Sequence, residues 1–336
     1  KLLLLNPPIF MKNVYGTMEK ITSYVPPQGL CQIASSLREK KIGVDLEILD
    51  ARALGFDARE TVKKLIEIKP DILGLTLFTS NLNVSSFVIK DYLKKIKKKV
   101  LVVGGGPDPT FHSKHFIENN PEFDLGVIGE GEETIAEIVE CYISGSAFDE
   151  VKGIVFVKDG QTIKTPRRES ISNLDSLPLP SWDLLPELKG HYRLSGCKVR
   201  SHKEGISIIT SRGCPGKCNF CNPRGLGFGI RFNSAEYIMK VVEDLYDNFG
   251  IRELYIQDDM FTANRDNVLR FCTLLQQSRF NIPWTCNARV DFIDTELLTE
   301  MKKAGCWQIG FGFESGSQKI LDTIGKKVTV EGILNR

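Results

Sequence analysis

The chain has 336 residues, of which 42% are hydrophobic and 26% charged, and its formal net charge is +2. This length favours two domains, and the near-neutral charge argues against nucleic acid as the main partner. The sequence contains no apolar run of roughly 20 residues that could span a bilayer, and its first residues lack the features of a signal peptide. The nine cysteines, an odd number, are typical of a reducing compartment. We therefore expect a cytoplasmic protein without a membrane span.

Residues 1–150 alternate short apolar runs with amphipathic segments. The alternation predicts βαβ units on a parallel sheet, that is, a Rossmann-like α/β domain. The expected strands cover residues 2–5, 44–49, 71–78, 100–105 and 123–129, and the expected helices cover 29–40, 58–68 and 85–98. The next segment, 153–165, predicts a hairpin that turns at Asp159-Gly160.

Prolines become frequent and periodicity fades after Pro166, so residues 151–204 are expected to form a hairpin and an ordered linker. A second α/β run occupies residues 205–336, with strands expected at 206–210, 253–259, 284–290 and 307–315. Ser234, Asn264 and Asp294 precede the expected helices and can cap them. Four βα units predict a partial (βα) TIM-type barrel, apparently truncated, because a full barrel needs roughly 200 residues or more.

Three cysteines lie within the stretch "TSRGCPGKCNFCNP" directly after the first strand of this second run: Cys214, Cys218 and Cys221. In parallel α/β folds, active sites form at the carboxyl ends of the strands. Cysteine thiolates at such short spacing can hold an iron–sulfur cluster, and three ligands on a four-iron cluster would leave one iron open for catalysis. A structural zinc site needs four ligands. Cys197 or His202 could supply the fourth, so zinc remains an alternative.

The Cys-x3-Cys-x2-Cys spacing, with Phe220 before the last cysteine and Ser-Arg-Gly leading in, resembles the signature of radical S-adenosylmethionine (SAM) enzymes. The resemblance continues in "YIQDDMF", "NARVD" and "GFGFESGS" at the next three strand ends. It implies a 4Fe-4S cluster on the three cysteines, with SAM bound through its amino and carboxylate groups to the open iron. It further implies two sets of site residues: Asp259, Arg289 and Glu314 as catalytic residues, and Phe220, Asp258 and Ser315 as cofactor-binding residues.

Each of these strand-end residues also has a structural alternative. Asp258 and Asp259 could form a solvated turn, and Arg289 with Asp291 could be a surface ion pair that contributes little. The cysteines on the same expected edge favour the functional interpretation for Asp259, Arg289 and Glu314, whereas Asp258 is evenly balanced.

The first domain lacks the glycine-rich turn of a nicotinamide-binding unit, since its first strand–helix turn reads "LNPPI", and "GKCN" is no P-loop. The segments "YVPPQGL", "LDARALG", "LTLFTSN", "VVGGGPDPT" and "VIGEGEETI" instead resemble the cobalamin-binding domain that precedes many radical SAM domains. The resemblance implies a cobalamin-binding domain over residues 1–150. Its expected cofactor-binding residues are Arg52, Thr76, Ser80, Gly104, Gly105, Gly106, Gly129 and Glu130.

Arg52 marks a departure from the cobalamin domains that supply a histidine to the lower face of cobalt. Those domains carry Asp-x-His-x-x-Gly, whereas this chain has Asp50-Ala51-Arg52-Ala53-Leu54-Gly55. Arginine stays protonated and does not ligate cobalt. We therefore expect no lower ligand from this loop, and a first domain that has lost cobalamin remains an alternative.

Together these resemblances imply a cobalamin-dependent radical SAM enzyme that cleaves SAM to a 5′-deoxyadenosyl radical. The first expectation is methylation of an unactivated carbon of a small-molecule substrate, with electrons from a reductant such as flavodoxin or ferredoxin. Ring formation or rearrangement is the alternative within this class. A non-catalytic binding module with structural zinc is the alternative outside it.

Overall fold

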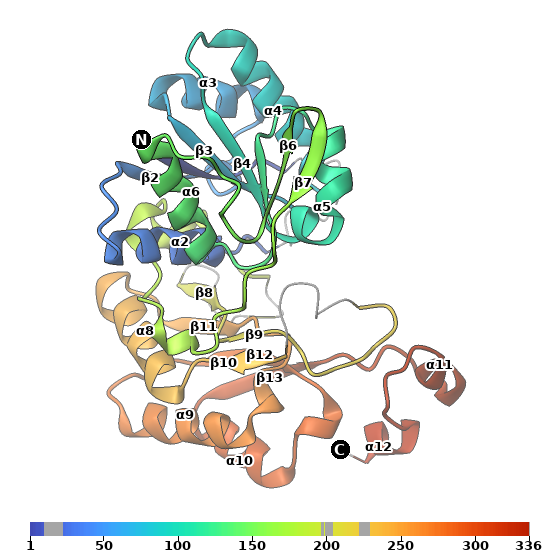
Figure 1. The fold of residues 1–336 in the computed structure, drawn as a ribbon. Coiled ribbons are helices and arrows are strands. Elements are labelled where there is room, and N and C mark those ends of the chain that lie inside the picture. Colours follow the sequence, from blue (N-terminus) through green and yellow to red (C-terminus); the bar gives the residue numbers. More distant parts are fainter. Residues whose placement is uncertain (10–22, 196–197, 199–203, 222–228, 336) are drawn as a thin grey trace. The chain divides into compact units, whose positions relative to one another are not determined.

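The computed structural model describes residues 1–9, 23–195, 198, 204–221 and 229–335. The chain divides into two compact units (Figure 1). Unit 1 comprises Lys1–Lys20, Pro26–Ile171 and Leu177–Glu187, and unit 2 comprises Ile21–Val25, Ser172–Ser176 and Leu188–Arg336. None of the helices in the described ranges combines the length and apolar character needed to cross a bilayer.

Unit 1 is built on a seven-stranded sheet in the order β2-β1-β3-β4-β5-β6-β7, in which β1 to β5 are parallel. Its strands are β1 (Leu2–Asn6), β2 (Leu46–Asp50), β3 (Ile72–Thr76), β4 (Leu101–Gly105), β5 (Leu125–Val127), β6 (Ile154–Lys158) and β7 (Gln161–Lys164). Its helices are α2 (Gln28–Glu39), α3 (Ala58–Ile68), α4 (Leu82–Lys95), α5 (Pro107–Asn119), α6 (Glu132–Ser144) and the 3-10 turn η3 (Trp182–Leu184). The predicted parallel α/β domain is therefore confirmed.

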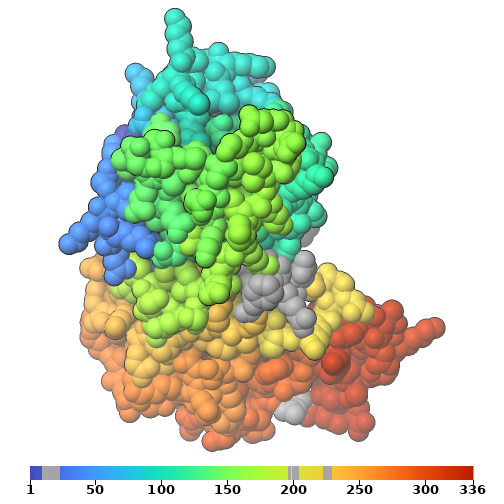
Figure 2. Space-filling model, viewed as in Figure 1, coloured from blue at the N-terminus to red at the C-terminus, as the bar shows by residue number. Residues whose placement is uncertain are grey.

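The predicted hairpin is also present. It is part of the sheet of unit 1, whereas the sequence patterns grouped it with the linker that follows. Strand β6 pairs antiparallel with β5, and β7 pairs with β6, with Asp159 and Gly160 at the turn. The hairpin thus extends the sheet of unit 1: Ile154, Val155 and Phe156 of β6 are buried in its core, whereas residues 157–161 around the turn are exposed on its surface (Figure 2). Of the proline-rich segment that follows, residues 177–187 pack with unit 1, whereas Ser172–Ser176, which contain η2 (Leu174–Ser176), pack with unit 2.

Helices cover both faces of the unit 1 sheet (Figure 1), with α2 against α6 on one face and α3 against α4 on the other. Helix α5 shares the core of α3 and α4 through Phe116, which is fully buried. Two glycines on adjacent strands make room for this ring. A Cβ atom on Gly104 would lie 2.6 Å from the ring, and one on Gly126 would lie 3.1 Å from it. Glycine at these two positions therefore lets α5 approach the sheet closely.

Unit 2 contains a second sheet of four parallel strands in the order β13-β12-β11-β8. Its strands are β8 (Gly205–Ile208), β11 (Glu253–Ile256), β12 (Trp284–Ala288) and β13 (Cys306–Phe311), with a two-stranded ribbon of β9 (Ser211–Arg212) and β10 (Arg231–Phe232). Its helical elements are α7 (Leu188–His191), α8 (Ala235–Asn248), η5 (Phe261–Ala263), α9 (Arg265–Gln277), η6 (Val290–Phe292), α10 (Thr295–Lys303), α11 (Gln318–Thr323) and α12 (Val330–Leu334). The described strands form an open sheet with the sequential order of a barrel segment.

The two faces of this sheet differ. The face toward α8, α9 and α10 is a core in which Trp284, Phe271 and Phe261 meet edge to face, with centroid distances from 5.6 to 6.1 Å. On the opposite face, Leu194 packs against Tyr255. The side chains of Ser234, Asn264 and Asp294 accept backbone N–H bonds at the starts of α8, α9 and α10, as predicted. Helices α8, α9 and α10 follow β8, β11 and β12 along the chain, and because these strands are parallel, the loops that carry the predicted site lie on one edge of the sheet.

Candidate active site

The three cysteines lie in one loop beyond the carboxyl end of β8. Cys214 and Cys218 are half-buried and Cys221 is exposed. Gly213, at φ +91°, turns the chain into this loop, and a Cβ atom there would lie 2.3 Å from the carbonyl oxygen of Gly229. Only glycine combines this backbone angle with so close a neighbour, so the turn ahead of Cys214 depends on Gly213.

Gly216 lies between the first two thiols. A Cβ atom on Gly216 would fall 3.2 Å from Sγ of Cys214 and 3.9 Å from Sγ of Cys218, and its own N–H donates to Sγ of Cys214 at 3.3 Å. The missing side chain thus leaves a space that both sulfur atoms border. A donor set of thiols alone, around backbone N–H groups, is the chemistry that iron–sulfur clusters require, so these residues fit a cluster.

The protonation behaviour of the thiols fits ligands better than a nucleophile. Partial burial raises the pKa values of Cys214 and Cys221, and the nearby carboxylate of Asp259 raises them further. A nucleophilic cysteine needs a lowered pKa, whereas a bound metal deprotonates its thiol ligands by its own charge. Among the described residues, no three His, Cys, Asp or Glu side chains are arranged to share a single ion. Cys197 and His202, the fourth ligands considered for zinc, lie outside the described residues.

Arg289 follows the end of β12 and reaches the cysteine loop. Its Nη1 lies 3.9 Å from Sγ of Cys218, and its side chain is only 12% exposed. A two-pronged ion pair with Asp291, at 2.9 and 2.8 Å, fixes the guanidinium. Nη2 also donates to the backbone carbonyl of Lys326 at 2.8 Å. The predicted pair of Arg289 and Asp291 is therefore real, and it aims the arginine at a cysteine sulfur.

Lys326 is a site residue that the sequence patterns did not reveal. Its side chain is 7% exposed, and Nζ donates to Oε1 of Glu314 at 2.9 Å. Glu314 lies past the end of β13 with φ +65°, a left-handed angle that is uncommon for a residue other than glycine and is found at functional sites. A buried ammonium is retained only with a partner. The signal that could have identified it is a lysine next to a glycine, Gly325, directly after a short helix.

Asp258 and Asp259 are adjacent in the chain and have opposite environments. Asp258 is 1% exposed, and Oδ1 accepts the N–H groups of Thr210 and Ser211 at 2.6 and 3.1 Å, while Oδ2 accepts the hydroxyl of Thr210 at 2.6 Å. Burial raises the pKa of Asp258 to about 6 despite these bonds. Both oxygens are thus engaged inside the protein, which differs from the predicted cofactor contact. Asp259 is exposed on the side of the thiols, and desolvation raises its pKa.

The other predicted residues of this edge are accessible. Phe220 is 58% exposed, and Ser315 is half-buried with its hydroxyl accepting the N–H of Ser317 at 3.1 Å. The structure therefore brings the cysteines, Asp259 and Arg289 into one group. Glu314 joins that group through Lys326.

Unit 1 has its own loop edge, where the direction of strand order changes between β1 and β3. In doubly wound sheets with this order, ligands bind outside the carboxyl ends of the strands near that point. The predicted cobalamin residues follow the carboxyl ends of four strands: Arg52 after β2, Thr76 and Ser80 at β3, Gly104, Gly105 and Gly106 at β4, and Gly129 and Glu130 after β5. The topology thus gathers them along one edge.

The glycines of this edge serve different needs. Gly104 is buried and its missing Cβ is explained by Phe116 and Leu77, whereas a Cβ on Gly105 would make ordinary contacts at 3.8 Å. Gly106 has φ +101° and lies against the backbone of Leu77. Thr110, which sequence patterns did not single out, donates to the carbonyl of Gly106 at 2.7 Å and accepts from the N–H of Gly129 at 3.0 Å. One hydroxyl therefore ties the β4 and β5 loops together.

The remaining predicted residues on this edge are held or exposed as follows. Asp50 accepts from Nδ2 of Asn6 at 2.9 Å and from the N–H of Ala53 at 3.0 Å, which fixes the turn that carries half-buried Arg52. Oε2 of Glu130 accepts the N–H of Ile171 at 2.7 Å. Thr76 is half-buried and Ser80 is exposed. Backbone positions and small polar groups are thus open to a ligand, which fits the approach of a nucleotide tail.

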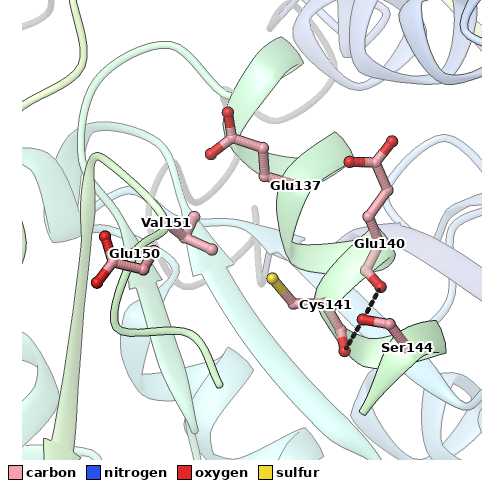
Figure 3. A pocket seen from close by; sticks show the side chains of 6 residues that line it. All are labelled: Glu137, Glu140, Cys141, Ser144, Glu150 and Val151. Carbon is pink, nitrogen blue, oxygen red and sulfur yellow. Dashed lines mark hydrogen bonds between the residues drawn. The ribbon is translucent and has the colours of Figure 1, made fainter. Parts of the chain in front are cut away.

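A hollow of about 300 Å³ in unit 1 lies elsewhere (Figure 3). It is lined by Glu137, Glu140, Cys141, Ser144, Glu150 and Val151. Four of these residues lie on α6, three of them in its last five residues, and the helices of such a sheet run opposite to its parallel strands. The hollow therefore lies at the far edge from the predicted cobalamin residues, and Glu137 already pairs with Arg168.

Comparisons with known proteins agree with this division. Residues 16–139 match the B12 binding domain family, and residues 208–336 match the radical SAM superfamily. The "uncharacterized methyltransferase PH0819" of Pyrococcus horikoshii is 34% identical over 98% of this chain and 68% of its own length. An anaerobic magnesium-protoporphyrin IX monomethyl ester cyclase of Cereibacter sphaeroides is 27% identical over 95% of this chain and 52% of its own length.

A solved structure shares the fold. The cobalamin-dependent S-adenosylmethionine radical enzyme OxsB, with aqua-cobalamin and S-adenosylmethionine bound, superimposes with a TM-score of 0.80 at 23% identity, over 98% of this chain and 46% of that one. The chain thus spans about half to two thirds of the length of the proteins that it matches. Both the sheet with the glycine loops and the sheet with the cysteine loop belong to this shared architecture.

Proposed function

The chain belongs to the radical SAM superfamily, as a member with an N-terminal B12 binding domain, and from this premise we propose that it is a cobalamin-dependent radical SAM methyltransferase. The observation that carries the proposal is the three-cysteine loop beside Arg289, in the same chain as a B12 binding domain. In such enzymes the cluster supplies one electron that cleaves SAM to methionine and a 5′-deoxyadenosyl radical, and cobalamin supplies a methyl carrier. The substrate that we propose is a small molecule with an unactivated carbon.

The residues of unit 2 have distinct tasks in this proposal. Cys214, Cys218 and Cys221 hold the cluster. The guanidinium of Arg289 lies beside Sγ of Cys218, and the N–H of Gly216 donates to Sγ of Cys214, a contact of the kind that tunes cluster potentials. In this proposal Asp259, Glu314 and Ser315, with the aromatic face of Phe220, bind and orient SAM.

On unit 1, small polar groups and backbone accept cobalamin. Thr76, Ser80 and the loops after β4 and β5 would form its binding edge, and Arg52 occupies the position at which other cobalamin domains carry a histidine. We propose that a flavodoxin or ferredoxin delivers the electron. Ring formation remains the second candidate because relatives named as cyclases match 95% of the chain, although at 27% identity against 34% for the relative named a methyltransferase.

Metal content is the first test. The protein is purified and reconstituted without oxygen, incubated with hydroxocobalamin and desalted, and iron, zinc and cobalt are counted together. We expect about four irons per chain and one cobalt, and formation of 5′-deoxyadenosine from SAM under a strong reductant. Iron without cobalt would refute the methyltransferase proposal, and zinc alone would refute the radical chemistry as well.

A pair of cysteine variants makes the assignment specific. Cys218→Ala should lose iron and SAM cleavage while it keeps the secondary structure of the parent. Cys141→Ser, which changes a thiol on α6 in unit 1, is the matched control and should keep both. Full SAM cleavage by Cys218→Ala would contradict the cluster assignment.

A further inference from the structure

The cysteine loop is connected to the rest of unit 2 at two places that lie far from it in sequence. The first is the chain that leads into the loop, and the second is the short stretch between Cys218 and Cys221. Both connections are made by side chains whose hydrogen bonds span many residues. This arrangement matters because a loop rich in glycine has no intrinsic reason to keep three thiols in one geometry.

Asp258 makes the first connection. Its carboxylate accepts three hydrogen bonds from two consecutive residues, Thr210 and Ser211, which follow the end of β8. These bonds cross from one strand end to the next over 48 residues of sequence. On the other side, the N–H of Asn233 donates to the carbonyl of Thr210 at 2.8 Å. The lead-in is therefore fixed from both sides, three residues before Cys214 begins the loop.

The carboxylate of Asp258 is suited to this task and to little else. It is 1% exposed, so it does not reach a ligand in the loop region. N–H and O–H groups that donate to an ionised carboxylate form short, strong bonds, and the 2.6 Å distances from the N–H and the hydroxyl of Thr210 fit that description. Its neighbour Asp259 is exposed toward the thiols. The carboxylate of Asp258 thus binds the backbone inside the protein, whereas that of Asp259 faces the site.

Asn219 makes the second connection. Its backbone N–H donates to the carbonyl of Ile324 and its Nδ2 donates to the carbonyl of Thr323, both at 2.9 Å. These carbonyls belong to the end of α11, where they have no partner within the helix. Gly325, at φ +67°, lies so close that a Cβ atom would fall 3.1 Å from Oδ1 of Asn219. The cysteine loop therefore caps a helix more than 100 residues away.

The same helix end leads into Lys326, whose carbonyl accepts from Arg289 and whose ammonium pairs with Glu314. Arg289 in turn reaches Sγ of Cys218. A displacement of the loop at Asn219 would therefore also displace the groups that the site uses on β12 and β13. Both connections therefore determine the position of the three sulfur atoms relative to these strand ends.

We propose that Asp258 and Asn219 are positioning residues that hold the cysteine loop in cluster-binding geometry. Asp258 fixes the start of the loop, and Asn219 attaches the loop to the end of α11. This inference rests on the proposed function, since it takes the three cysteines as cluster ligands. Neither residue touches the cluster or SAM in it. Their effect is on how firmly, and in which geometry, the cluster is held.

The test compares reconstituted variants of the whole chain. Asp258→Asn, Thr210→Val, their double variant and Asn219→Ala are matched with two controls on exposed positions of unit 2, Asp266→Asn on α9 and Asn248→Ala on α8. Two properties are measured without oxygen: the rate at which a chelator removes iron, and the electron paramagnetic resonance spectrum of the reduced cluster with and without SAM. Thermal unfolding of the iron-free proteins is recorded in parallel.

We expect iron loss to be faster by about fivefold or more in Asp258→Asn, Thr210→Val and Asn219→Ala, as for the loss of at least one hydrogen bond, and unchanged in both controls. Because Asp258 acts through Thr210, the double variant should lose iron no faster than its worse single parent. The resonance g-values should shift in the variants, an effect that a general loss of stability does not produce.

The outcomes separate this inference from the function on which it depends. If the parent protein binds no iron, the proposed function fails. If the parent binds iron while Asp258→Asn and Asn219→Ala match it in iron loss and g-values, this inference alone is overturned. Equal acceleration in the two control variants would also overturn it.

Discussion

Replacing Gly104 by alanine tests whether this glycine serves packing inside unit 1. The new methyl group would lie 2.6 Å from Cζ of Phe116 and 2.7 Å from Cδ1 of Leu77, both shorter than any normal contact. Phe116 is fully buried between α5 and the sheet and also packs against Phe123 at 5.1 Å. The ring is therefore enclosed by α5, the sheet and Phe123.

The expected magnitude follows from two opposing effects. Overpacking a filled core costs about 1–3 kcal/mol, whereas replacing glycine at an ordinary backbone angle stabilises by about 0.4–1 kcal/mol through the unfolded state. The net loss for Gly104→Ala should be about 1–2 kcal/mol. For a domain of this size, that corresponds to about 2–4 °C in unfolding temperature for each kcal/mol.

Gly105→Ala is the matched control one residue away. Its methyl group would have only contacts at 3.8 Å, and neither glycine has a left-handed backbone angle. We expect this control to be as stable as the parent or slightly more so. The assay is thermal or urea unfolding of the cofactor-free protein, followed by circular dichroism.

Phe116→Leu in the Gly104→Ala background should recover part of the lost stability, because the shorter side chain leaves room for the methyl group. A Gly104→Ala protein as stable as Gly105→Ala would refute the packing argument. It would leave the approach of a ligand as the reason for glycine at position 104.

Three other predictions concern single groups. Because the pKa of Asp258 is raised to about 6 in the folded state, the folded protein takes up a proton on Asp258 more readily than the unfolded chain does. The stability of the parent relative to Asp258→Asn should therefore rise by about 2 kcal/mol as the pH falls from 7 to 4. Urea titrations that give a pH-independent difference would contradict this. Arg52→His restores the sequence Asp-x-His-x-x-Gly. The electron paramagnetic resonance spectrum of bound cob(II)alamin should then gain nitrogen splitting from the new histidine, which the parent and Arg52→Lys both lack. Identical spectra would place residue 52 away from cobalt. Glu314→Ala leaves the buried ammonium of Lys326 without its carboxylate and should lower the free energy of unfolding in urea by about 1–3 kcal/mol. Lys326→Met in the same background should recover most of this loss. No recovery would mean that the two side chains do not act as a pair.

The sequence by itself determined the layout of this protein. Strands alternate with helices because apolar residues repeat with the period of each element, and that repetition is local, so both sheets, the hairpin at Asp159-Gly160 and the caps at Ser234, Asn264 and Asp294 could be predicted. The cysteine spacing is equally local. It identified the family that the comparisons later supported.

Contacts between distant segments could not be derived from such patterns. The sequence left the role of Asp258 evenly balanced. Only the packing of β11 beside β8 buries Asp258 on the backbone of Thr210, while Asp259 stays exposed. Lys326 and Asn219 gave no pattern, since their partners lie at the ends of other elements. The sequence predicted that Gly104 binds a cofactor, whereas in the structure Phe116 of α5 packs against it. In each case the deciding interaction joins residues 12 to 104 positions apart, and such contacts depend on geometry that exists only once the strands are assembled.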